Sequence, residues 1–151
     1  MSLLQIDFDK LQSSYALLSD SLTRLPPLAP AMLNNSIAME PYDALASRFE
    51  RFVEIAVNRF FRSVEIHQFG KKSESLRDRL LNMQKIGLVS SVELWMEMRD
   101  FRNRIVHDYL PEQLVAMINT IRDRFRTEIN LSLAKSVGSM MPLQERRHVP
   151  S

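Results

Sequence analysis

Cysteine is absent from this 151-residue sequence, and glycine is scarce, with only 3 residues. The absence of cysteine excludes disulfide bonds and cysteine-ligated metal sites, and it is typical of a reducing compartment. We therefore expect a cytoplasmic protein. The scarcity of glycine, together with the clustering of the 7 prolines, argues against a turn-rich β fold and favours helices.

Long apolar runs are also missing, since no stretch approaches the roughly 20 residues that a membrane-spanning helix needs. The first residues lack the basic start and apolar centre of a signal peptide. We therefore expect a soluble protein that does not associate with membranes. The formal net charge is only +2, so any argument for nucleic-acid binding depends on how the charges are distributed.

Apolar residues recur at the spacing of an amphipathic helix in five segments. These segments cover about residues 7–25, 41–68, 73–87 and 91–107, and a fifth one begins at Pro111. The length is typical of one domain. The sequence therefore predicts an all-α fold, an antiparallel bundle of four to five helices.

Polar residues and prolines at the segment ends indicate where the helices begin. Asp7 is the expected N-cap of the first helix, and Pro41 is expected in the first turn of the second. Ser73 is expected to open the third helix, and Ser90 with Glu93 has the spacing of a capping box for the fourth.

The last part of the chain has no helical periodicity and contains Gly138 and Pro142. We therefore expect a bundle domain over residues 1–135 and a loose, flexible C-terminal tail over residues 136–151.

One arginine lies on the apolar side of its own predicted helix. With about 100° per residue, Arg102 lies at roughly 340° from Trp95, within the arc that also holds Met98 and Val106. Burying an unpaired charge is costly, so Arg102 requires a partner, a cleft or a ligand. The alternative is that its head group extends past an apolar stem to solvent.

Asn103 and His107 are four residues apart and share a face beside Arg99. Arg102 and His107 are five apart, or about 140° around an ideal helix, so they do not strictly share one. A dimer cleft or a relaxed helix end would be needed to bring them together. The alternative role for His107 is to cap the helix C-terminus, where a cation is favoured.

The second predicted helix carries a basic stripe. Four arginines fall within about 80° of one another on an ideal helical wheel: Arg48, Arg51, Arg59 and Arg62. One interpretation is a solvated face. The other is a positive surface for phosphates, in which these residues and Arg99 contact RNA.

The sequence Arg102-Asn103-x-x-x-His107-x-Tyr109 resembles the Arg-x4-His-x-Tyr motif of HepT toxins within the HEPN superfamily. The resemblance covers about residues 5–134. It implies a metal-independent ribonuclease without a cofactor, acting as a homodimer in which Arg102 and His107 of two protomers face one cleft. It assigns Arg102 to the phosphate, the acid–base steps to the His107 pair, and an orienting role to Asn103.

The same resemblance implies regulation by a cognate minimal nucleotidyltransferase, an antitoxin that attaches AMP to Tyr109. The first hypothesis is therefore an RNA endonuclease toxin of a toxin–antitoxin pair. The second is a non-catalytic HEPN module that binds a nucleotidyltransferase as a substrate-binding or regulatory partner. The third is a helical adaptor in which the motif is accidental and Tyr109 is a packing residue.

Overall fold

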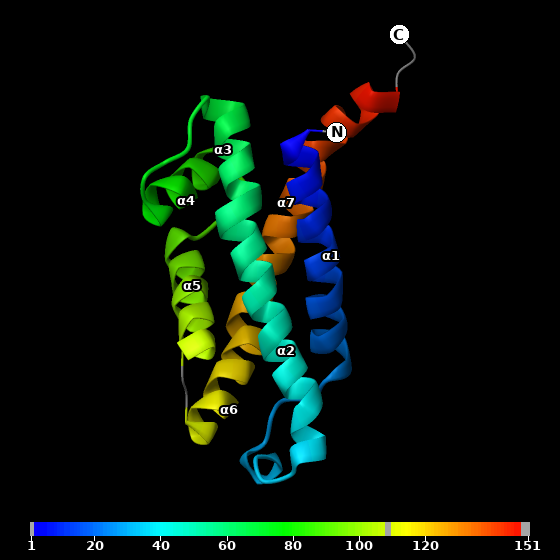
Figure 1. The fold of residues 1–151 in the computed structure, drawn as a ribbon, viewed down its shortest axis with the longest axis vertical. Coiled ribbons are helices and arrows are strands. Elements are labelled where there is room, and N and C mark those ends of the chain that lie inside the picture. Colours follow the sequence, from blue (N-terminus) through cyan, green and yellow to red (C-terminus); the bar gives the residue numbers. More distant parts are fainter. Residues whose placement is uncertain (1, 108–109, 149–151) are drawn as a thin grey trace.

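The computed structural model of the chain describes residues 2–107 and 110–148, with side chains except at 105–107, 111 and 144–148. The described residues form an all-α bundle, as the sequence predicts (Figure 1). Its helices are α1 (Leu3–Arg24), α2 (Ser36–Ile55), α3 (Phe61–Phe69), α4 (Leu76–Lys85), α5 (Val92–His107), α6 (Pro111–Thr120) and α7 (Arg126–His148).

Two of the bundle's long helices each contain a π-helical turn. The turn η2 (Ala56–Phe60) joins α2 to α3, and η3 (Ile121–Phe125) joins α6 to α7, so each pair continues along one direction (Figure 1). A short 3-10 helix, η1 (Pro30–Met32), lies in the loop after α1. The bundle is antiparallel: α1, α2–α3, α5 and α6–α7 alternate in direction, and the shorter α4 connects α3 to α5 (Figure 1).

The helix starts differ from the predicted ones. Ser2, not Asp7, caps α1 by accepting the Gln5 N–H at 3.1 Å. Asp7 is instead buried one turn into the helix, where it accepts a hydrogen bond from the Ser63 hydroxyl. Asn35 caps α2, so that Pro41 lies inside the helix rather than in its first turn.

The third and fourth helices also begin later than predicted. Ser75, not Ser73, caps α4, and Ser91, not Ser90, caps α5 by accepting the Leu94 N–H at 3.1 Å. Ser73 and Ser90 are not caps because each hydroxyl donates to a buried carboxylate, Glu65 and Glu128 respectively. Both predicted caps lie within two residues of the observed one, but the sequence does not reveal that Glu65 and Glu128 bind these serines.

The predicted loose tail from residue 136 is wrong for most of its length, because α7 continues to His148. Ser136 and Met140 are buried, and the Ser136 hydroxyl donates to the Ser132 carbonyl one turn earlier. Gly138 costs about 1 kcal/mol relative to alanine inside a helix. The burial of this segment against the bundle outweighs the cost of placing Gly138 inside a helix.

Aromatic side chains dominate the core. Trp95 of α5 is fully buried, with its ring centroid 5.1 Å from that of Phe61 and 6.3 Å from that of Phe52. The Trp95 indole N–H donates to Glu128 at 3.2 Å, which satisfies its polar end. The ring contacts with Phe52 and Phe61 hold α5 against α2–α3 and so determine where the C-terminal half of α5 lies.

Glu65 is a second buried carboxylate, and it holds the connection between α3 and α4. It accepts hydrogen bonds from Ser73, from Arg79 Nε at 2.8 Å and from Asn82 at 2.9 Å. Arg79 also donates to the carbonyl of Val57 at 2.8 Å, within the π turn η2. The cluster therefore stabilises both the α3–α4 corner and the irregular turn behind it.

The pKa of Glu65 lies below its ordinary value of 4.5. Burial by itself raises this pKa, but the hydrogen bonds from Ser73, Arg79 and Asn82 together outweigh the burial. A carboxyl with a lower pKa in the folded state stabilises the fold most above its unfolded pKa. That stabilisation is lost as the pH falls through the folded value.

No helix among residues 2–107 and 110–148 combines the length and apolar character needed to cross a membrane.

We expect Glu65→Gln to lower the free energy of unfolding at pH 7 by about 3 kcal/mol, because it leaves Arg79 without its buried counter-charge. We also expect the variant to lose less stability than the wild type between neutral pH and pH values below the ordinary Glu pKa of 4.5. Urea unfolding at a series of pH values measures both effects. Equal pH dependence of the two proteins would contradict this account of Glu65.

Candidate functional site around Arg102

The candidate site lies where the C-terminal half of α5 packs against α2. Arg102 Nη2 forms an ion pair with Glu54 of α2 at 2.8 Å, and Arg102 Nη1 donates to Asn103 Oδ1 at 3.0 Å. The side chains of Arg102 and Glu54 are 28% and 40% exposed. Arg102 therefore has the partner that its position on an apolar arc requires, and its head group still reaches solvent.

Not every donor of Arg102 has a partner among the described residues. Its Nε atom is buried and, among the described residues, has no hydrogen-bond partner. A guanidinium group has five donor hydrogens, and the described contacts with Glu54 and Asn103 involve one on each Nη atom. A half-exposed arginine with spare donors can bind a phosphate or carboxylate if that group competes with Glu54.

The rest of the motif is only partly described. His107 is the last residue of α5, and its side chain lies outside the described residues. Tyr109, the predicted modification site, also lies outside them. The structure thus places Arg102 and Asn103 together, and it places the backbone of His107 at the end of the same helix.

Two other arginines, Arg99 and Arg104, lie on this part of α5. Arg99 approaches Asp100 at 3.4 Å, a long contact between a half-buried arginine and an exposed aspartate. Arg104 lies over the Phe101 ring at 4.2 Å, which is a cation–π distance. Phe101 in turn packs edge-to-face on Phe125 at 5.0 Å. Cations near a helix C-terminus are favoured by its dipole, so the positive charge here does not oppose the helix.

The predicted basic stripe is divided by the π turn. A π turn contains about one extra residue, which rotates the residues after it by roughly 100° relative to an ideal wheel. Arg59 lies within η2 and Arg62 lies after it, so they are rotated away from Arg48 and Arg51. The ideal wheel that placed all four arginines within about 80° therefore does not apply to this helix.

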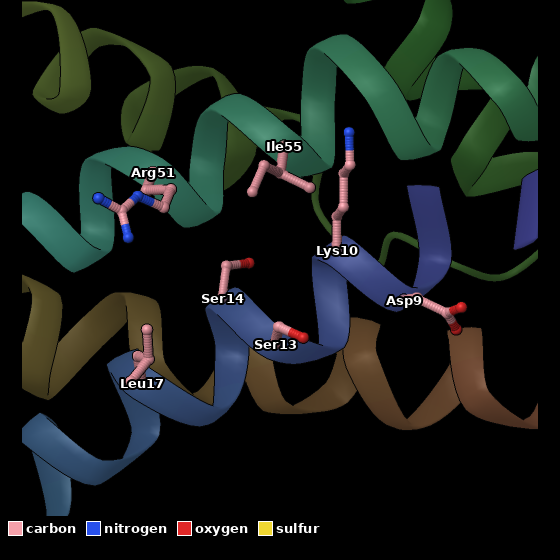
Figure 2. Close-up of a pocket in the computed structure, with 7 residues that line it drawn as sticks. All are labelled: Asp9, Lys10, Ser13, Ser14, Leu17, Arg51 and Ile55. Carbon is pink, nitrogen blue, oxygen red and sulfur yellow. The ribbon is translucent and has the colours of Figure 1, made fainter. Parts of the chain in front are cut away.

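The four arginines also differ in what they contact. Arg48 donates to the Leu17 carbonyl at 3.1 Å and to the Ser21 hydroxyl at 2.7 Å, so it joins α2 to α1. Arg51 is exposed and lines a groove between α1 and α2 (Figure 2). Arg59 is exposed, whereas Arg62 is half-buried. Arg48 is thus occupied by structural contacts, and Arg51 and Arg59 are the most accessible of the set.

Glu54 is the site residue that the sequence alone does not reveal. It lies on a different helix, far from the motif in the chain, and no spacing rule links it to Arg102. The only available signal is that an arginine on an apolar face needs a counter-charge. Within the described part of the chain, no group of three or more histidine, cysteine or carboxylate side chains is arranged to hold a metal ion.

We expect Arg102→Gln to lower the free energy of unfolding by less than about 1 kcal/mol, because half-exposed ion pairs contribute little in water. Urea unfolding of this variant, of Glu54→Gln and of the double variant forms a thermodynamic cycle that isolates the pair. A loss of about 3 kcal/mol or more from Arg102→Gln would indicate a buried structural pair instead. A small loss means that Arg102 variants can be used to test function without unfolding the protein.

A comparison with protein-family models relates the whole bundle to known proteins. A model described as nucleotidyltransferase substrate binding protein like matches residues 7–137, a range that includes Glu54, Arg102 and His107. None of the curated proteins compared with the chain gives a significant match. The family is consistent with the helical superfamily that the Arg102–Tyr109 motif resembles. Because the match covers most of the chain, the protein belongs to the nucleotidyltransferase substrate-binding-protein-like family.

Proposed function

We propose that this protein is the binding partner of a separate nucleotidyltransferase. The observation that carries the proposal is the family match, which extends over residues 7–137 and so includes every helix of the bundle at least in part. The chain itself supports a binding role, because the Arg102 side chain is 28% exposed and its described contacts are limited to Glu54 and Asn103. Such a group is suited to an anionic substrate or to an acidic residue of a partner.

The motif suggests what the nucleotidyltransferase acts on. In the HepT-type arrangement Tyr109 would receive AMP, two residues after the end of α5. The transferred phosphate would bring negative charge and bulk to the helix end that carries Arg99, Arg102 and Arg104. It would then compete for the cations that an RNA phosphate requires.

The second candidate function is metal-independent RNA cleavage by a homodimer. It is favoured by the presence of Arg102, Asn103 and His107 in the last two turns of one helix. Attack of a ribose 2′-hydroxyl on the adjacent phosphate needs a base, an acid and a cation for the developing charge. Two histidines across a two-fold axis would supply the base and the acid, and Arg102 would hold the phosphate after exchanging Glu54 for it.

In this second function, Glu54 and the RNA phosphate compete for one guanidinium group. The 2.8 Å ion pair keeps Arg102 oriented towards α2 while no phosphate is bound. The exposed position of the pair keeps the exchange inexpensive. Arg51, Arg59, Arg62 and Arg99 remain the proposed RNA contacts, whereas Arg48 is engaged with α1.

We expect the purified full chain to bind a minimal nucleotidyltransferase, its proposed cognate partner, with a dissociation constant of about 1 µM or tighter, as for a specific complex. Isothermal titration calorimetry measures the affinity and the stoichiometry. A titration with no heat, together with separate elution on size exclusion at high concentration, would overturn the proposed partnership.

We expect the wild type to cleave single-stranded RNA in the presence of a chelator, and His107→Ala to be at least about 100-fold slower because the acid–base group is lost. His67→Ala is the matched control, since His67 is an exposed histidine on α3. Gel analysis of labelled RNA gives the rates. Chelator-sensitive cleavage, or equal rates for wild type and His107→Ala, would refute this second function while leaving the partnership intact.

A further inference from the structure

A groove lies between α1 and α2 and includes neither Arg102 nor Glu54. Its volume is about 340 Å³. Figure 2 shows Lys10, Ser13 and Leu17 on the α1 side, facing Arg51 and Ile55 on α2. The groove is open to solvent and runs along the two helices, so it presents a surface rather than an enclosed cavity.

The floor of this groove is apolar although it faces water. Leu17 on the α1 wall is 42% exposed, and Ile55 on the α2 wall is half-buried. Leu3 and Ile6 are also exposed on this stripe of α1, and Lys10 and Ser13 separate them from Leu17. A groove with apolar walls and a polar rim is suited to a protein-interaction site.

The rim of the groove is cationic. Lys10 and Arg51 form no ion pair with any described residue, and they come from opposite walls. The carboxylate of Asp9, at the α1 wall, already accepts a hydrogen bond from Gln5 at 2.8 Å. Asp9 keeps its negative charge, but Figure 2 shows it at the end of the groove opposite Arg51, with its carboxylate directed away from Arg51. The groove therefore offers a partner one cation on each wall.

These features favour one kind of occupant over two others. A second copy related by a two-fold axis would place the Lys10 and Arg51 surface against itself, which like-charge repulsion opposes. An RNA strand would gain from the two cations but nothing from the apolar floor. An amphipathic helix with an apolar stripe flanked by acidic residues satisfies both the floor and the rim.

We propose that the α1–α2 groove is the docking site for an acid-flanked amphipathic helix of the nucleotidyltransferase. This inference rests on the proposed partnership and adds to it the surface and the chemistry of contact. Apolar contact with Leu17 and Ile55 provides the affinity, and the pairs with Lys10 and Arg51 set the direction of the helix. Arg102 itself is not among the residues that line the groove.

The test compares the full-length wild type with the double variant Lys10→Glu/Arg51→Glu and with the single variant Leu17→Ala. The matched control is Lys72→Glu, which reverses the charge at an exposed lysine between α3 and α4. We expect the double variant to bind the nucleotidyltransferase at least about tenfold more weakly, since like charges then face the acidic partner. We expect Leu17→Ala to weaken binding and Lys72→Glu to leave it unchanged, with equal urea midpoints for all four proteins.

Calorimetric affinities separate this inference from the proposed partnership. Wild-type affinity in both the double variant and Leu17→Ala overturns the groove assignment and leaves the partnership standing. Failure of the wild type itself to bind overturns both. If the variants lose self-association or RNA binding while their affinity for the nucleotidyltransferase stays intact, the groove belongs to that other occupant and the inference is wrong.

Discussion

The burial of Trp95 is the interaction on which the rest of this structure depends. Its ring packs on Phe61 and Phe52, and its indole N–H is satisfied by Glu128 of α7, so one side chain connects three long helices. Arg102 follows two helical turns later, on nearly the same face of α5. The packing of Trp95 therefore directs Arg102 towards α2, where Glu54 meets it. The candidate site is a consequence of this core contact.

Charge serves two different purposes in the bundle. Glu65 and Glu128 are buried and surrounded by hydrogen-bond donors, so they fix corners and helix ends. The pair between Arg102 and Glu54 is half-exposed and has few other partners. Buried pairs are costly to break, whereas exposed pairs exchange readily with solvent or ligand. The contrast is what singles out Arg102 as a group that can change partners during function.

Much of the fold could be predicted from the sequence, because helical periodicity depends on local spacing. The all-α class and the number of long segments follow from it. Gly70, directly after α3, adopts the left-handed conformation typical of a glycine that ends a helix. The serine caps were displaced by one or two residues because Ser73 and Ser90 bind carboxylates that are distant in sequence. The helix beyond residue 136 was missed because its burial is a tertiary effect.

The candidate site was predictable only where it depends on one helix. The unusual position of Arg102 and its adjacency to Asn103 are visible in the sequence, but Glu54 is not, because it belongs to another helix. The ideal helical wheel used for the basic stripe does not describe this helix, because the π turn at Ala56–Phe60 changes its angular register. The π turn contains no proline or glycine that would have indicated an irregular helix at this position.

Hydroxyl-radical footprinting of the chain, alone and mixed with the nucleotidyltransferase, tests the central claim of a protein partnership most directly. It reports the solvent exposure of individual side chains along the whole protein. The account predicts reduced labelling of Leu17 and Ile55 in the mixture, while Ile37, which is 78% exposed at the start of α2, stays reactive. Identical labelling of every residue with and without the nucleotidyltransferase would contradict it.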